Sequence, residues 1–283
     1  MIRWLLLFAS LILAWSPPGV AREVPSVEED PLSRISTDSV KTHNINAAKI
    51  LSDILADPHY WEGAWVKKYS NRSYEEVRFK EVGRGFVPMI AGDGGTDVAH
   101  DVVSRVAFSQ FSDLPKHISM MRKVVYLGQG YDPTIDAEYT DTYFFLDGTI
   151  IYVAFSWRMY RKHDPQTDRT VLWFEKLPTS AVDLDTMAAY QQTIDQTLAS
   201  INLRSVFNQV AEPTEVFGMF VLDPGKKHDT YVTFVAKMDF GEDTSWLIRW
   251  GSQLRFVLRA GLQHAFEGAV AICLDEMKKA TSP

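Results

Sequence analysis

The chain has 283 residues, of which 46% are hydrophobic and 12% aromatic, and this is enough to build a large core. Its 29 basic and 36 acidic residues give a formal net charge of −7, so the chain lacks the basic surface that nucleic-acid binding requires. A single cysteine, Cys273, excludes an intrachain disulfide and a thiolate metal site.

The N-terminus has the pattern of a secretory signal peptide. Arg3 precedes an apolar run over Trp4–Trp15, and a Gly19-x-Ala21 ending follows. We expect cleavage after Ala21 and a periplasmic or secreted location. An uncleaved membrane anchor is the alternative, although the apolar run is shorter than the roughly 20 residues of a membrane span. Residues 22–43 are polar and acidic and predict a flexible leader.

The remaining residues, 44–283, are expected to form a single domain. Apolar residues at helical spacing predict a helix over Asn44–Ala56, and His59–Trp65 is an aromatic turn. Tyr74–Val82 alternates polar and apolar residues like an edge strand. The glycine-rich segment Gly92–Gly95 is interpreted as a loop.

Two further helices and a series of strands are predicted next. Val98, Val102 and Val106 recur at helical spacing, and Lys116–Arg122 indicates a short second helix. Alternating segments bounded by turn residues then predict strands over Val124–Leu127, Ala137–Leu146, Thr149–Tyr160, Thr170–Lys176, Val216–Leu222 and Tyr231–Phe240. The short connections between neighbouring strands indicate an antiparallel meander.

A helical insertion interrupts this meander over residues 182–210. Its helical stretches are predicted at Leu184–Ala199 and Leu203–Phe207, and we expect it to cover one mouth of the fold. A long amphipathic helix, roughly Thr244–Lys278, closes the chain. The expected fold class is therefore α+β: a curved antiparallel β-sheet wrapped around a long C-terminal helix, with an extra N-terminal helix and the helical insertion.

Two segments carry a resemblance to a known family. Val98–Gly128 is similar to the opening helix, bend and following strand of the START-like (SRPBCC) superfamily of lipid-transfer proteins and polyketide cyclases. Tyr231–Met277 resembles that family's final strand, turn and gripping helix, with Asp239-Phe-Gly241 as the turn. The chain departs from the pattern at Ile118 or Met120, where an aromatic residue is common. The resemblance implies a helix-grip fold with a cavity for a hydrophobic ligand.

Large apolar residues of the sheet and of the terminal helix are the candidate cavity lining. In the strand from Thr149, alternate residues face one side of the sheet and should face the core or cavity. The candidate ligand-binding residues are Tyr143, Phe145, Val153, Phe155, Trp157, Trp173, Phe234, Trp250, Leu254, Val257, Gly261 and Ala265. The alternative is that the aromatic residues simply fill the core. The small residues Gly261, Ala265 and Gly268 either leave room for a ligand or let the helix approach the sheet closely.

Few residues suggest a polar site. Arg158 and Arg249 are candidates for pairing with a ligand headgroup, and ordinary surface arginines are the alternative. The seven histidines show no metal-ligand spacing, and neither a nucleophile elbow nor a phosphate-binding loop occurs. We therefore expect no metal, no cofactor and no catalytic residues.

These observations favour a secreted protein that binds or transports a lipid or another hydrophobic small molecule, with transient membrane contact. The first alternative is a cyclase or aromatase type of enzyme on the same fold, with Arg158, His264 or a tyrosine as acid–base groups. The second is a non-catalytic interaction protein without a cavity, docking through residues 182–210.

Overall fold

The computed structural model describes residues 51, 53, 56, 57, 59–68, 76–82, 89–109, 111–118, 120–147, 152–178, 180, 182–201, 210–225, 229–241 and 267–276. Its strands are β1 (Trp65–Lys68), β2 (Glu76–Val82), β3 (Met89–Thr96), β4 (Met121–Asp132), β5 (Ala137–Asp147), β6 (Tyr152–Asp164), β7 (Arg169–Lys176), β8 (Val210–Ala211), β9 (Glu215–Pro224) and β10 (Thr230–Asp239). Its helices are α3 (His100–Ser109), the 3₁₀ turn η2 (Phe111–Asp113), α4 (Leu114–His117), α5 (Leu184–Ala199) and an unlabelled C-terminal helix over 267–276.

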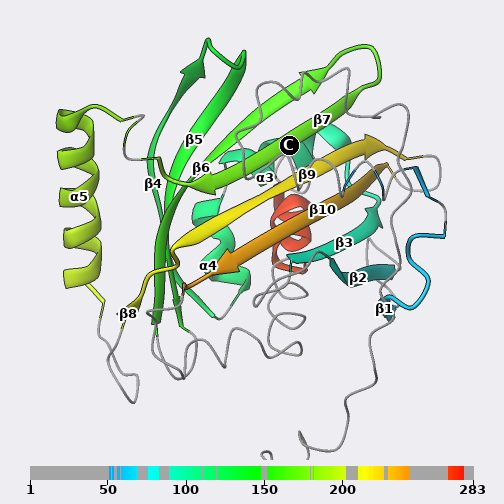
Figure 1. Cartoon of the computed structure of the whole chain (residues 1–283), viewed down its shortest axis with the longest axis horizontal. Coiled ribbons are helices and arrows are strands. Elements are labelled where there is room, and N and C mark those ends of the chain that lie inside the picture. Colours follow the sequence, from blue (N-terminus) through cyan, green and yellow to red (C-terminus); the bar gives the residue numbers. More distant parts are fainter. Residues whose placement is uncertain are drawn as a thin grey trace, which may run out of the picture.

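All of these strands belong to one sheet, with the order β1-β2-β3-β10-β9-β7-β6-β5-β4 (Figure 1). Neighbours along this path are antiparallel, and only the two-residue β8 pairs in parallel, with β6. The predicted antiparallel meander is therefore confirmed. It runs from β4 to β7 and continues, after the insertion, through β9 and β10.

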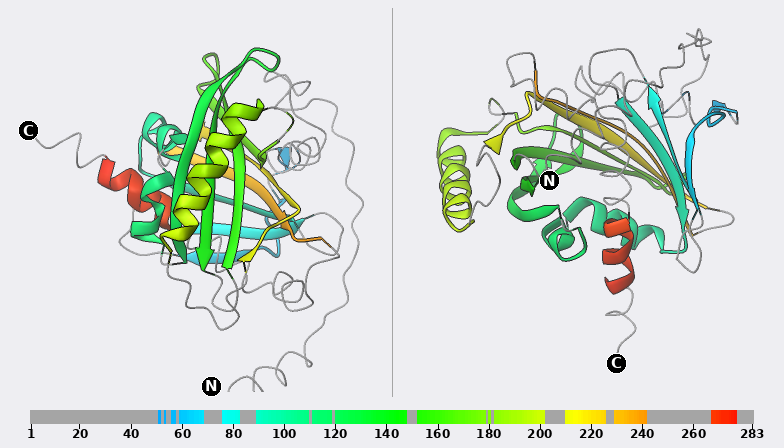
Figure 2. Two further views of the ribbon diagram at one scale, coloured as in Figure 1. Left: turned by 90° about the vertical axis from the view of Figure 1, so that its left-hand side faces the viewer. Right: turned by 90° about the horizontal axis from the view of Figure 1, so that it is seen from below.

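The sheet curves around three helices. Figure 2 shows α3, α4 and the helix 267–276 together on the concave side. Ile272 and Cys273 of that helix share one buried apolar cluster with Val103 and Val106 of α3 and with the strands beneath. The expected curved sheet with a C-terminal helix against one face is confirmed. The rest of the predicted terminal helix lies outside the described residues, as does most of the predicted helix over residues 44–56, of which 51, 53 and 56 are helical.

The opposite, convex face of the sheet is also covered. Ile194 and Leu198 of α5 pack on Tyr143 and Phe145 of β5. Elsewhere on the same convex face, Leu51, Tyr60 and Trp61 pack in a cluster that contains Trp173 of β7. A sheet buried on both faces needs apolar residues at successive positions, and β5 has them in its run Tyr143–Leu146.

The covering of the convex face corrects the prediction that three residues line the cavity. Tyr143, Phe145 and Trp173 point away from the helix 267–276 and cannot line a space between it and the sheet. By contrast, Val153, Phe155 and Trp157 of β6 belong to the cluster that contains Ile272 and Cys273. The predicted alternation along β6 is correct, because successive side chains of a strand point to opposite faces.

The insertion contains the first of the two helical stretches predicted for it, over the same residues, Leu184–Ala199, and the second, Leu203–Phe207, lies outside the described residues. The helix begins there because the side chain of Asp183 caps it, accepting a hydrogen bond of 2.9 Å from the amide of Thr186. Its position is not the expected one. α5 lies on the convex face beside β4 and β5, and does not cover a mouth of the fold on the concave side (Figures 1 and 2).

Two local predictions were wrong. Gly92–Gly95 is not a loop but the middle of β3, which pairs with β2 on one side and β10 on the other. The second helix is α4, Leu114–His117, and by Met121 the chain has already entered β4. Sheet pairing overrides local preference in both places, since Gly92–Gly95 gains hydrogen bonds on both edges of its strand.

The convex face also contains Arg158, which was expected to hold a headgroup. The Arg158 side chain is 5% exposed and its partner Asp141 is 0% exposed; the guanidinium Nε and Nη2 donate to the two carboxylate oxygens at 2.7 Å. The hydroxyl of Tyr190, from α5, donates to the same carboxylate at 3.1 Å. Burial alone would lower the pKa of Arg158, but the hydrogen bonds and charge of Asp141 raise it overall. Arg158 is a structural residue under α5.

Replacing Asp141 should therefore destabilise the folded protein strongly. We expect Asp141→Asn to lower the free energy of unfolding by about 3–5 kcal/mol, because it leaves the buried Arg158 charge without its partner. The matched control is Glu138→Gln, three residue pairs away on the same two strands, where Glu138 and Arg161 are partly exposed; it should cost less than about 1 kcal/mol. Urea denaturation of both variants measures the difference. Equal small losses would show that the buried pair does not stabilise the fold.

Candidate functional site

A continuous row of aromatic rings crosses the concave face from β5 to β1. Neighbouring ring centroids along it are 4.4 to 6.1 Å apart, which is the usual spacing of interacting aromatic pairs. The members of this aromatic row, from β5 to β1, are Phe144, Phe155, Trp157, Phe174, Phe220, Phe234, Phe79 and Trp65.

Two glycines make this row possible. A Cβ at Gly92 of β3 would lie 2.5 Å from Cζ of Phe234, so the ring can lie over β3 and meet Phe79 on β2 only because no side chain stands there. In the same way a Cβ at Gly218 of β9 would lie 2.6 Å from Cζ of Phe174. Gly92, which lies in the segment that suggested a loop in the sequence, is thus a packing requirement of the sheet.

Part of the aromatic row keeps an accessible surface. Five of its members are buried, whereas Trp157, Phe220 and Trp65 are only partly buried. The helix 267–276 approaches the row through Val270, which packs with Phe79 and Phe234. The concave face therefore combines a broad apolar floor with a helix that covers only some of it.

The helix itself is held by close packing. A Cβ at Gly268 would lie 2.3 Å from Cγ1 of Ile118, so this small residue serves a tight contact with the end of α4, the second of the two roles considered for the small residues of the helix. His117 Nε2 lies 3.5 Å from a carboxylate oxygen of Asp275. Burial raises the pKa of the Cys273 thiol to about 12, so this cysteine remains protonated and unreactive.

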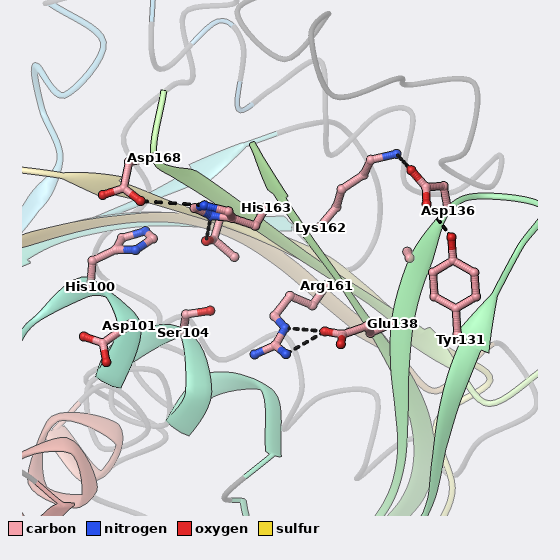
Figure 3. A pocket seen from close by; sticks show the side chains of 12 residues that line it. His100, Asp101, Ser104, Tyr131, Asp136, Glu138, Arg161, Lys162, His163 and Asp168 are labelled. Carbon is pink, nitrogen blue, oxygen red and sulfur yellow. Dashed lines mark hydrogen bonds and ion pairs between the residues drawn. The ribbon is translucent and has the colours of Figure 1, made fainter. Parts of the chain in front are cut away.

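A second feature of the concave side is a polar cleft of about 560 Å³ between the start of α3 and the ends of β4–β7 (Figure 3). Arg161 donates two hydrogen bonds to Glu138, at 2.9 and 2.6 Å. His163 Nδ1 lies 3.1 Å from the hydroxyl of Thr170. The lining residues are His100, Asp101, Ser104, Tyr131, Asp136, Ala137, Glu138, Arg161, Lys162, His163, Asp168 and Thr170.

Helix α3 separates the cleft from the aromatic row. Its residues Val103 and Val106 enter the apolar cluster that includes the part of the row on β5, β6, β7 and β9, whereas His100, Asp101 and Ser104 line the cleft. At 100° per residue these two sets lie on opposite sides of the helix. The concave side therefore has one apolar and one polar compartment.

Within the described residues, no group of three or more histidine, cysteine, aspartate or glutamate side chains is placed to hold a metal ion. In the same part of the chain, no helix has the length and apolar character needed to cross a membrane.

The curved antiparallel sheet, with α3 and α4 after β3 and the last helix on the same concave face, is the arrangement that the sequence resemblance implied. The fold is START-like. No protein-family model matches the chain, and neither does any curated protein sequence.

Solved structures with START-like folds are similar to it at low identity. Human STARD10 is 12% identical over 92% of this chain and 86% of that chain, with a TM-score of 0.47. The lipid transfer and protein localization domain of human StarD13 is 12% identical over 82% and 94%, with a TM-score of 0.42. The Zhui aromatase/cyclase from Streptomyces sp. R1128 is 12% identical over 73% and 99%, with a TM-score of 0.38. This level of likeness carries no information about the ligand.

The START-like fold brings together four of the predicted lining residues on its concave face: Val153, Phe155, Trp157 and Phe234. Trp250, Leu254, Val257, Gly261, Ala265 and Arg249 lie outside the described residues. The sequence analysis missed five members of the aromatic row: Phe144, Phe174, Phe220, Phe79 and Trp65. The signal that identifies Phe144 is register, since it stands directly opposite Phe155 and so shares its face.

The close contact at Gly92 is testable by a double-mutant cycle. Gly92→Ala should lower the free energy of unfolding by about 1–3 kcal/mol, because the new methyl group overlaps the Phe234 ring. In a Phe234→Leu background the same substitution should cost about 1 kcal/mol less, since the overlapping ring end is gone. Denaturation of the four proteins gives the coupling energy. Strictly additive losses would mean that Phe234 does not lie over β3.

Proposed function

We propose that this protein binds and carries a lipid or another hydrophobic small molecule between the concave face of the sheet and the C-terminal helix. The observation that carries the proposal is the aromatic row: eight rings spanning β5 to β1, of which Trp157, Phe220 and Trp65 keep accessible surface. Apolar, aromatic-lined hollows are the usual form of small-molecule sites.

An apolar surface of this kind binds without a specific polar partner. Each methylene moved from water onto it contributes about 0.8 kcal/mol. A ligand with a long chain or several fused rings would therefore gain affinity from contact area alone. Native mass spectrometry and lipid extraction of the purified protein identify such a ligand. Protein that is always recovered empty, and that takes up no apolar probe, would favour an interaction protein without a cavity.

A pair of tryptophan variants tests which face binds. Trp157→Leu should weaken binding of a fluorescent fatty acid such as parinaric acid about tenfold, because it removes a ring of the aromatic row worth one to two kcal/mol of contact. Trp173→Leu is the matched control: Trp173 lies on the neighbouring strand β7 but faces the convex side. It should leave the affinity of the folded protein unchanged. Equal weakening by both variants would place the ligand elsewhere.

We propose that the protein is not an enzyme. Arg158, one of the acid–base groups considered for a cyclase or aromatase, is buried on the convex face against Asp141 and cannot reach a ligand on the aromatic row. His264 lies outside the described residues. Chemical change of a recovered ligand on incubation with the protein would contradict a purely carrying role.

The location outside the cytoplasm and a transient membrane contact belong to the same proposal, supported by the signal-like N-terminus. Fractionation of expressing cells with N-terminal sequencing tests the location: a mature chain that starts at Arg22 is expected, and a start a few residues later would not change the location. An intact N-terminus in the cytoplasmic fraction would exclude it. Co-flotation with lipid vesicles tests the membrane contact.

A further inference from the structure

The polar cleft beside α3 holds hydrogen-bonding groups that the fold does not use. Ser104 is 8% exposed, and its hydroxyl faces the cleft (Figure 3) without a hydrogen-bond partner in the described part of the chain. The hydroxyl oxygen itself is open to the cleft, where a ligand or a water molecule can form a hydrogen bond with it. Asp101 lies one turn earlier on the same side of α3, and the described residues offer its carboxylate no partner either.

Other groups in the cleft are held rigidly. The Arg161 guanidinium is fixed by Glu138 through Nε and Nη2 and lies 4.3 Å from the ring centroid of Phe108, so Nη1 is left to donate. His100 Nε2 lies 3.2 Å from the carbonyl oxygen of Leu222. Because a carbonyl only accepts, this nitrogen must carry the proton, and Nδ1 of the neutral ring is left as an acceptor. The unused donors and acceptors are therefore preorganised.

The charges of the cleft argue against an anionic ligand. Four carboxylates against two cations leave a net charge of −2 with both histidines neutral: Asp101, Asp136, Glu138 and Asp168 against Arg161 and Lys162. Both cations are already in ion pairs, Arg161 with Glu138 at 2.6 Å and Lys162 with Asp136 at 3.2 Å. A phosphate or carboxylate would meet uncompensated negative charge.

A neutral ligand with several hydroxyl groups fits what remains. Each hydroxyl both donates and accepts, and Ser104, Asp101, Arg161 and His100 offer a mixture of donors and acceptors. At the rim, Tyr131 has a side chain that is 56% exposed, and its hydroxyl donates to Asp136, which holds the ring in place. A fixed, exposed aromatic ring gives the apolar C–H face of a sugar a surface to lie on.

We propose that this cleft is a second binding site, separated by α3 from the aromatic row, and that it takes a neutral polyhydroxylated ligand: a free sugar or the sugar headgroup of a glycolipid. Its volume of about 560 Å³ lies within the range of small-molecule sites. The site does not depend on the hydrophobic ligand proposed above, since no residue of the aromatic row lines the cleft.

Ligand-observed NMR and calorimetry on the purified chain test the proposal with glucose, galactose, mannose, maltose and lactose. At least one sugar should bind with an affinity that added NaCl does not change, because the ligand is uncharged. Phosphatidylcholine vesicles with and without galactosyl diacylglycerol distinguish the two sources of the same chemistry. Binding to a soluble sugar indicates the free sugar, and binding only to the glycolipid vesicles indicates the headgroup.

Two variants and two matched controls localise the binding. Ser104→Ala should weaken it about fivefold and Asp101→Asn about tenfold, through loss of a neutral and of a charged hydrogen bond. Ser109→Ala changes a serine of the same helix outside the cleft, and Asp185→Asn an acid in the first turn of α5. Both controls should leave the affinity unchanged.

The proposal is overturned if no sugar or glycolipid binds to protein that circular dichroism shows to be folded. It is also overturned if Ser104→Ala and Asp101→Asn bind as well as their controls. Tight, salt-sensitive binding of spermidine in place of the sugars would show that the cleft is a cation site. Sugar binding that survives Trp157→Leu would confirm that the two compartments are independent.

Discussion

The concave face of this protein depends on how closely two aromatic rings approach the sheet. Phe234 lies over β3 and Phe174 over β9, and each position is open only because the strand beneath has a glycine, Gly92 or Gly218. With any larger residue there the rings would be displaced, and the contacts that link Phe79 to Phe234 and Phe174 to Phe220 would be lost. A broad apolar floor on a curved sheet therefore requires missing side chains as well as large ones.

On the convex face the main constraint is a buried charge. A strand of the central sheet that is buried on both sides must also bury the polar residues it contains, and Asp141 is one of them. Its charge is matched by Arg158 and by the hydroxyl of Tyr190. Gly128 on β4 admits that tyrosine, since a Cβ there would lie 2.3 Å from its hydroxyl oxygen. The α5 insertion is thus fastened to the sheet by a polar contact inside an apolar layer, which fixes where the helix lies.

Periodicity made much of this fold predictable, and its limits are equally physical. The alternation in β6 gave the correct face for Val153, Phe155 and Trp157, and the helical spacing gave the bounds of α5. The run Tyr143–Leu146 has no alternation, because both faces of β5 are covered, so residue type alone could not tell which side Tyr143 and Phe145 face. Gly92–Gly95 was predicted to be a loop because the contact between Gly92 and Phe234, far away in the sequence, cannot be recognised from the local residues.

The cleft was missed for a related reason. His100, Ser104 and Arg161 have no spacing that marks a site, and they meet only when α3 crosses the ends of the hairpins. Sequence reasoning finds groups on one element far more readily than groups brought together by packing. The same holds for Arg158, whose partner Asp141 stands directly opposite it on the adjacent strand, a relation that appears only once the register is known.

The position of the single cysteine has a practical consequence. Cys273 lies where the helix 267–276 meets the strands, and the sequence contains no other cysteine to compete with it. An excursion that lifts this helix from the strands would bring the sulfhydryl into contact with solvent. The rate at which Cys273 is alkylated therefore reports how often the helix separates from the strands in the protein without any mutation. A bound ligand that stabilises the packed helix would slow that rate.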